Sequence, residues 1–113
     1  MSVKFKNPFS NKRIFRDVTK ERPEAVQAVL STSSPDVIVK IYECGESIII
    51  HSTNSNTNCA SISNSKGYSY VQEWEIDYMI KHILKKSKED VVMYFSQNGV
   101  IYLRAKEDLV LKN

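Results

Sequence analysis

The chain contains little glycine, and this scarcity excludes several kinds of catalytic site. Only three glycines occur among 113 residues, and none belongs to a glycine-rich loop of the kind that cradles phosphates. The serine-hydrolase pattern GxSxG and the zinc-protease pattern HExxH are also absent. Because no motif places a nucleophile beside a base, we expect a non-enzymatic protein with no catalytic residues and no cofactor.

Cysteine and histidine are also scarce, which argues against a metal site. The chain has two of each, Cys44, Cys59, His51 and His82, and their spacing matches no zinc-binding pattern. The cysteines form no CxxC pair, and we expect them to be reduced and inert rather than joined in a disulfide.

Long hydrophobic runs are missing as well. No apolar stretch approaches the roughly 20 residues of a membrane-spanning helix, and the N-terminus has no apolar signal-peptide region. The hydrophobic content of 42% and charged content of 26% are ordinary for a globular protein. We therefore expect one cytoplasmic domain over residues 1–113, without a membrane partner.

The basic charge is concentrated at the N-terminus. Residues 1–22 contain seven Lys or Arg and two acidic residues, whereas the rest of the chain has a net charge of −2. Such a segment suits phosphates or an acidic protein surface. The alternative is a solvated tail, partly disordered, that only keeps the protein soluble.

The strongest structural pattern is a predicted hairpin over residues 91–106, with the sequence VVMYFSQNGVIYLRAK. Asn98-Gly99 is typical of a two-residue type I′ turn. That turn would pair Phe95 with Tyr102 and Met93 with Arg104. One face of this hairpin is then aliphatic, and the other carries aromatic and basic side chains.

A second predicted hairpin covers residues 37–52. Gly45-Glu46 suits a type II′ turn, which pairs Ile41 with Ile50 and Lys40 with His51. This hairpin again has one aliphatic face and one face with aromatic and basic side chains. A turn at Cys44-Gly45 would shift the pairing.

Two helices are predicted around these hairpins. Pro23 suits the first turn of a short helix that ends in the Ser/Thr/Pro-rich residues 31–35. Ser69, with Gln72 three residues later, predicts the capping box of a long helix. Residues 53–67 are predicted to be a loop that could contain a short strand at 59–63. The expected fold is α+β: an antiparallel sheet of two β-hairpins, with a long helix between them and a short N-terminal helix.

Aromatic and basic side chains alternate on the predicted hairpins, and this pattern favours nucleic-acid binding. Strands can enter the grooves of DNA, and aromatic residues on a sheet can stack on unpaired bases. The pattern does not distinguish DNA from RNA, although duplex DNA is the expected form. The candidate contacts are Lys12, Arg13, Arg16, Lys40, His51, Lys66, Tyr102, Arg104 and Lys106.

Residues 37–106 resemble a known family in the order of their elements. The segments that carry the resemblance are VKIYECGESIII, the predicted helix WEIDYMIKHILKK and the predicted hairpin VVMYFSQNGVIYL. They resemble the double-wing DNA-binding domain of MotA-type middle-transcription activators of T4-like phages. The resemblance implies a regulatory DNA-binding protein whose hairpin wings, with Lys40, His51, Tyr102, Arg104 and Lys106, contact DNA.

The alternative function is that of a protein-binding module or inhibitor, which a phage could encode. The predicted long helix carries Trp74, Tyr78, Lys81 and Lys85 on the side opposite its aliphatic stripe. Exposed Trp and Tyr are good interface anchors, either for a partner protein or for a homodimer. If the N-terminal segment covers this side of the helix instead, these residues are structural.

Overall fold

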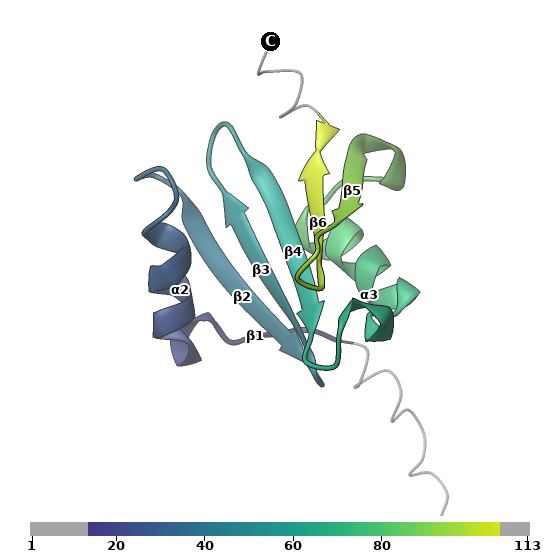
Figure 1. Cartoon of the computed structure of the whole chain (residues 1–113). Coiled ribbons are helices and arrows are strands. Elements are labelled where there is room, and N and C mark those ends of the chain that lie inside the picture. Colours follow the sequence, from purple (N-terminus) through teal and green to yellow (C-terminus); the bar gives the residue numbers. More distant parts are fainter. Residues whose placement is uncertain (1–13, 107–113) are drawn as a thin grey trace, which may run out of the picture.

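The structure, a computed structural model, describes residues 14–106 and consists of a six-stranded antiparallel sheet with a short helix on each face (Figure 1). The strand order is β1-β2-β3-β4-β6-β5, so β1 and β5 form the two edges. The strands are β1 (Arg16–Asp17), β2 (Ile38–Cys44), β3 (Ser47–Thr53), β4 (Asn58–Asn64), β5 (Val91–Phe95) and β6 (Val100–Ala105). The helices are α2 (Pro23–Leu30) and α3 (Glu73–Tyr78), which continues as the π-helix η4 (Met79–Ile83); single 3-10 turns are η2 (Thr19–Glu21), η3 (Tyr68–Tyr70) and η5 (Lys88–Asp90).

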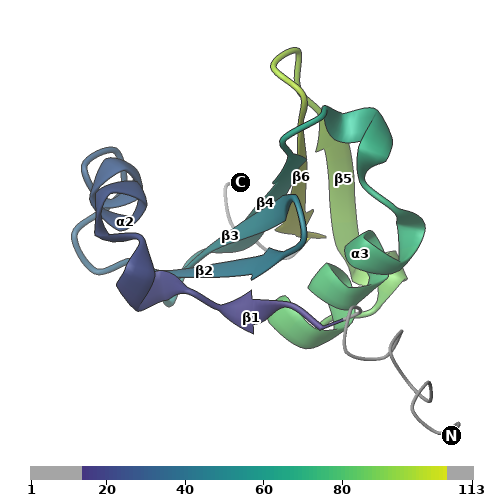
Figure 2. The ribbon, with the colours of Figure 1, turned by 90° about the horizontal axis from the view of Figure 1, so that it is seen from below.

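The sheet is bent, and its two faces are covered unequally. Viewed from below, β5 and β6 turn away from the plane of β2 and β3, so that α2 lies on the concave side (Figure 2). Helix α2 packs on Val39 and Ile41 of β2, near one end of this concave face. We call it the α2 face, and the opposite side, on which α3 packs, the α3 face.

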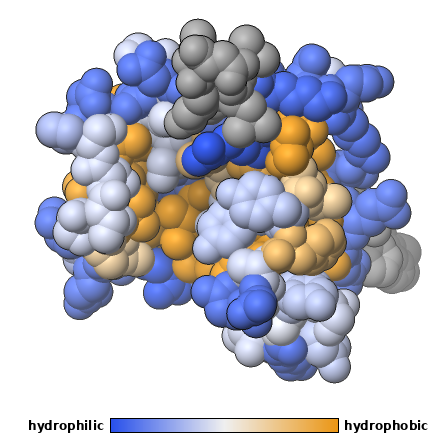
Figure 3. All heavy atoms as spheres, turned by 45° about the horizontal axis from the view of Figure 1, so that its top comes forward, coloured by the Kyte–Doolittle hydropathy of each residue, from blue (hydrophilic) through white to orange (hydrophobic). Residues whose placement is uncertain are grey.

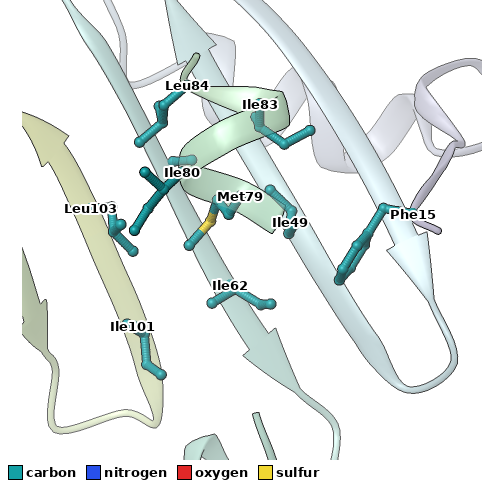
Figure 4. Close-up of a cluster of buried hydrophobic side chains, with 10 residues drawn as sticks. Phe15, Ile49, Ile62, Met79, Ile80, Ile83, Leu84, Ile101 and Leu103 are labelled. Carbon is teal, nitrogen blue, oxygen red and sulfur yellow. The ribbon is translucent and has the colours of Figure 1, made fainter. Parts of the chain in front are cut away.

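The main hydrophobic core lies between α3 and the α3 face (Figure 4). Met79 and Leu84 from the helical segment pack on Ile49, Ile62 and other aliphatic side chains of the central strands. In β3 the run Ile48–Ile50 is apolar throughout because α2 covers one of its faces and α3 the other. In β4, which α2 does not cover, Ala60 and Ile62 of the α3 face alternate with serines.

The prediction of a long helix between two hairpins is wrong. Helix α3 and the π-helix together span only Glu73–Ile83, six and five residues. The capping box is formed by Gln72 and Glu75, because Tyr68–Tyr70 is a separate 3-10 turn and Val71 is extended. The helical segment ends where Lys85 adopts a φ of 58°.

Residues 53–67 were predicted to be a loop that could contain a short strand at 59–63, and the strand is confirmed and longer than expected. Asn58–Asn64 forms β4, a strand of seven residues that pairs with both β3 and β6. The Asn/Ser-rich turn that precedes it is short: Asn54 Oδ1 accepts hydrogen bonds from the N–H groups of Asn56 and Thr57, both 2.8 Å. The sheet is therefore one continuous structure through β4 rather than two separate hairpins.

The short N-terminal helix and the hairpin at residues 37–52 are confirmed. Helix α2 begins at Pro23, and β2 pairs with β3 in the expected register, Ile41 opposite Ile50 and Lys40 opposite His51. Gly45 has a φ of +60°, as the first central residue of a type II′ turn requires.

The register predicted for the hairpin at residues 91–106 is wrong by one residue. Tyr94, not Phe95, lies opposite Tyr102, and Arg104 lies opposite Val92. The loop has three residues, 97–99, since the N–H of Ser96 donates to the carbonyl of Val100 at 2.9 Å. Gly99, with a φ of +85°, occupies the left-handed position that ends a three-residue loop. Tyr94 and Tyr102 consequently share one face of the sheet.

Replacing Gly99 with alanine is expected to lower the free energy of unfolding by about 1–2 kcal/mol, because an L-residue in the left-handed region is strained. A Cβ atom at this position would meet only the backbone nitrogen of Tyr68, at 4.0 Å, so crowding adds little. Urea unfolding followed by circular dichroism measures the change. The matched control is Gly99→Asn, since asparagine tolerates this conformation better. Equal losses for both variants would contradict a cost that arises from φ.

No helix within the described part of the chain is long and apolar enough to cross a membrane.

Candidate binding groove

A groove of about 450 Å³ runs along the uncovered part of the α2 face, between α2 and the β5–β6 hairpin. Figure 3 shows this face as a hollow with hydrophobic surface at its bottom and more polar surface around it. The bend of the sheet sets β6 apart from α2 (Figure 2), and the groove lies on the α2 face between them. The groove is lined by Ala28, Val29, Thr32, Ile50, Ser52, Cys59, Ala60, Ser61, Tyr94, Tyr102, Leu103 and Arg104.

The floor of the groove combines Ile50 of β3 with small side chains on β3 and β4. Ser52 lies opposite Cys59 in the sheet, and Ser61 follows two residues later on the same face. Because these side chains are short, they leave room above the sheet that larger residues would fill. On β4 the groove is thus formed by the polar face of the strand, with Cys59 and Ser61, and not by the apolar face that packs on α3.

Two stacked tyrosines form the wall on the hairpin side. The rings of Tyr94 and Tyr102 are 5.4 Å apart and inclined by 20°. The three-residue loop creates this pair, since it places the two tyrosines directly opposite each other on β5 and β6. Tyr94 is 48% exposed, so much of its ring remains available to a ligand.

Arg104 supplies the single charged side chain of the groove lining. It lies two residues beyond Tyr102 on β6, opposite Cys59 of the floor and Val92 of β5. Among residues 14–106, no carboxylate oxygen lies within 4 Å of its guanidinium group. A guanidinium in a half-buried, largely apolar groove is a specific binding group for a carboxylate or a phosphate.

The surrounding domain is electrically neutral. Residues 14–106 contain eleven Lys or Arg and eleven Asp or Glu. The basic excess of the chain therefore lies outside the described residues, where Lys12 and Arg13 of the predicted nucleic-acid site are found.

The two predicted basic-aromatic hairpin faces do not form one surface, contrary to our expectation. Tyr102 and Arg104 lie on the α2 face, in the groove, whereas Lys40 and His51 lie on the α3 face, because His51 is in register with Ala60 and, through it, with Leu103. Lys40 Nζ is 4.0 Å from an Asp17 carboxylate oxygen.

Other predicted contact residues lie apart from the groove. Arg16 is on the edge strand β1, within 3.6 Å of Glu43 and 3.9 Å of Glu21. Lys66 follows β4 and lies 3.5 Å from Glu46. Lys106 is exposed directly after β6, and thus near Arg104 along the chain.

The aromatic side of α3 is not a free interface. Phe15, which is 4% exposed, packs on both Trp74 and Tyr78, with ring centroids 5.9 and 5.3 Å apart. The N-terminal segment thus covers these two side chains, as one of the two sequence interpretations predicted. Lys81 and Lys85 of the same predicted interface are exposed.

The cysteines lie on opposite faces of the sheet and form no disulfide. Cys44 is packed against the α3-side core, where burial raises the pKa of its thiol and so disfavours the reactive thiolate. Cys59 belongs to the groove floor. Within residues 14–106, no group of three His, Cys, Asp or Glu side chains is placed to hold a metal ion.

Sequence reasoning found Tyr102 and Arg104 but missed Tyr94 and the floor. The alternation of serine with Ala60 and Ile62 was visible in the sequence and indicates a strand with one apolar and one polar face. No sequence signal showed that Tyr94 would join Tyr102, because the turn sequence is compatible with two registers.

Comparisons with known proteins identify a family. A search of curated proteins found no match. The crystal structure of a conserved protein of unknown function from Streptococcus thermophilus LMG 18311 has a similar fold, with a TM-score of 0.63 and 18% sequence identity over 81% of this chain and 94% of that chain. The family model described as "Domain of unknown function (DUF1827)" matches residues 14–109. Because this match covers most of its length, the chain belongs to the DUF1827 family.

Proposed function

We propose that this protein is a protein-binding module whose groove holds a linear segment of a partner protein, with an acidic group of that segment against Arg104. The observation that carries the proposal is the groove itself: an open hollow with apolar and small side chains, two stacked tyrosines and one charged residue. Cys44 and Cys59 form no disulfide, as in proteins of a reducing compartment, and we propose the cytosol as the place of this interaction.

The size of the groove suits a short stretch of peptide. A volume of about 450 Å³ lies within the range of roughly 300–1,000 Å³ typical of ligand sites. The groove is open to the surface rather than enclosed, as the binding of a segment of a larger protein requires. The small side chains of Ser52, Cys59 and Ser61 leave space for side chains of the ligand.

Tyrosine and arginine are the residue types that most often dominate binding energy at protein interfaces. Tyr94 and Tyr102 offer large contact areas, and their mutual stacking reduces the conformational entropy that binding would otherwise remove. Arg104 can bind a carboxylate through two parallel hydrogen bonds. These groups lie on adjacent strands of a paired sheet, so they are held in place before the ligand arrives.

Charge favours an acidic peptide over a long polyanion as the ligand of the described domain. Residues 14–106 have no net charge, and the groove contributes one cation. Nucleic-acid binding depends on several Lys or Arg that neutralise successive phosphates. The separation of Lys40 and His51 from Tyr102 and Arg104 removes the combined surface that would supply them.

Arg104→Gln is expected to weaken peptide binding about 10- to 100-fold. Loss of a hydrogen-bonded charge pair costs roughly 1.5–3 kcal/mol, and each 1.4 kcal/mol changes the affinity about tenfold. The full chain is used to select binders from a displayed library of random linear peptides, and a synthetic peptide from the enriched set is titrated by calorimetry. The enriched peptides should share an acidic position.

The matched control is Arg16→Gln, which removes an exposed arginine on the far edge strand and should leave the affinity unchanged. Failure to enrich any peptide, or equal affinities for wild type and Arg104→Gln, would refute the proposal. In parallel, the chain is titrated with a random duplex and with single-stranded DNA. Binding that weakens steeply with salt, at about −0.9 in logarithmic slope for each duplex phosphate, would instead support the nucleic-acid function implied by the double-wing resemblance, which stays a prediction.

A further inference from the structure

Strand β5 forms one edge of the sheet, and its own residues carry no feature that would protect this edge from pairing with another chain. It consists of five residues, VVMYF, all of them apolar or aromatic, and within residues 14–106 it pairs with β6 alone. Natural edge strands usually avoid pairing with other chains by being very short or bulged, or by carrying proline or charged side chains. None of these devices occurs within Val91–Phe95.

The opposite edge of the sheet, formed by β1, carries features that prevent pairing with another strand. Strand β1 has only two residues, Arg16 and Asp17, and both are charged and exposed. Asp17 accepts hydrogen bonds from the hydroxyl and the N–H of Thr19, at 2.6 and 2.9 Å, which lower the pKa of its carboxyl group. Arg16 lies 3.6 Å from Glu43. The β1 edge is therefore short and charged, unlike the β5 edge.

Along the outer edge of β5, several backbone N–H and C=O groups have no hydrogen-bond partner in the described part of the chain. Since the Ser96 N–H donates to β6, alternation along the strand directs the N–H and C=O groups of Tyr94 and Val92 toward β6 as well. The N–H and C=O groups of Met93 and Phe95 then point outward. The carbonyl of Val91 also points outward. The Val91 N–H does not, because it donates a hydrogen bond to the carbonyl of Lys88 in the preceding turn.

Exposed apolar side chains accompany these backbone groups. Met93, Tyr94 and Phe95 are 45%, 48% and 55% exposed. Tyr68, itself 43% exposed, contacts Phe95 with ring centroids 5.4 Å apart and extends the apolar surface. Met93 and Phe95 lie on the α3 face and Tyr94 lies on the α2 face, so apolar side chains stand on both sides of the unpaired backbone groups. Such an arrangement is typical of an edge strand that pairs with another strand.

We propose that β5 pairs antiparallel with β5 of a second copy of this chain, around a two-fold axis at Met93. In this register Met93 of each copy lies opposite Met93 of the other, and Val91 lies opposite Phe95. The Met93 N–H of each copy donates to the Met93 carbonyl of the other, and the Phe95 N–H donates to the Val91 carbonyl. All the outward groups named above, except the carbonyl of Phe95, are then used.

The sequence around β5 suits a second copy because it opposes no like charges. In the same register Asp90 lies opposite Ser96, and Glu89 lies opposite Gln97, so the acidic residues before the strand meet uncharged residues of the loop. A two-fold axis also produces a closed dimer, which leaves no β5 edge free for further growth.

The pairing has a consequence for the groove. A two-fold axis through two antiparallel edge strands is perpendicular to the sheet, so the α2 faces of both copies lie on the same side. Tyr94, which points to that face from β5, would bring the two groove walls close to the axis. The dimer would present two grooves to one partner, although the pairing itself does not depend on what the grooves bind.

Sedimentation equilibrium of the full chain is expected to show a concentration-dependent monomer–dimer equilibrium. Met93→Pro should weaken the dimer at least tenfold, since it removes the two central donors, one from each copy. Proline is tolerated in an edge strand where the N–H points away from the sheet, so the β6 ladder should be kept. Met93→Lys, which keeps the N–H but adds a charge at the axis, is the second variant and should also favour the monomer.

The matched control is Ile38→Lys, because Ile38 is an apolar residue of β2 that is 57% exposed and lies away from the β5 edge. Its dimerisation should equal that of the wild type, and circular dichroism should show the same strand content in all variants. A monomer mass at about 1 mM chain, where even a millimolar dissociation constant gives substantial dimer, would overturn the proposal. A dimer that both Met93 variants leave intact, or open-ended oligomers, would also overturn it.

Discussion

Replacing Ile62 with alanine is expected to lower the free energy of unfolding by about 3–4 kcal/mol, the largest effect of any single truncation considered for this domain. Ile62 is fully buried on β4, directly between Ile49 of β3 and Ile101 of β6 (Figure 4). Met79 of the π-helix belongs to the same cluster and closes it from the helix side. Because paired strands and a helix surround the site, the structure can collapse little around the missing atoms, and a cavity remains.

Urea unfolding at constant slope measures this change, and Ile38→Ala is the control. Ile38 is the same residue type in a neighbouring part of the sheet, but it is 57% exposed, so its truncation should cost less than about 0.5 kcal/mol. Losses of similar size at the two positions would contradict the placement of the core between α3 and β4.

Local turn chemistry explains why one hairpin could be predicted in register and the other could not. Gly45-Glu46 has its glycine first, and a type II′ turn with two central residues is the arrangement that needs glycine there. Asn98-Gly99 suits a type I′ turn, but glycine also suits the last position of a three-residue loop. The second arrangement is the one found, and it decides which tyrosine lies opposite Tyr102.

The central strand and the helix length depended on tertiary contacts that local patterns do not contain. Residues 58–64 have the polar composition of a loop, and they form β4 because Ala60 and Ile62 complete a core that β3, β6 and α3 provide. The groove could not be predicted for the same reason: part of its floor is the polar half of β4, and the bend of the sheet sets its two sides apart. Arg104 and Tyr102, by contrast, were recognisable as candidates from residue type and alternation alone.

The N-cap of α3 is Gln72 rather than the predicted Ser69, and a buried carboxylate explains the difference. Glu75 is 7% exposed, and its Oε1 accepts hydrogen bonds from the Gln72 N–H at 3.1 Å and from the Ser47 hydroxyl at 3.0 Å. Ser47, which is 1% exposed, in turn accepts a hydrogen bond from the Asn64 side-chain amide at 2.9 Å. This network connects the first turn of α3 to β3 and β4, and it can form only if the helix begins at this residue.

Glu75→Ala is accordingly expected to lower the free energy of unfolding by about 2–4 kcal/mol, since it removes the acceptor of the buried Ser47 hydroxyl and of the partly buried Gln72 N–H. Glu75→Gln retains an acceptor oxygen and should cost clearly less. The matched control is Glu73→Ala, because Glu73 is an exposed carboxylate in the same first turn and shares the favourable helix-dipole position, worth only about 0.3–1 kcal/mol.

A double-mutant cycle with Ser47→Ala separates the network from the cap. If Ser47 and Glu75 act together, the loss for the double variant should be smaller than the sum of the single losses by about 1–2 kcal/mol. Additive losses, or equal effects of Glu75→Ala and Glu73→Ala, would show that α3 is held by its apolar face alone. Coupling would show instead that a polar contact between Glu75 and the sheet helps to hold the first turn of α3 in place.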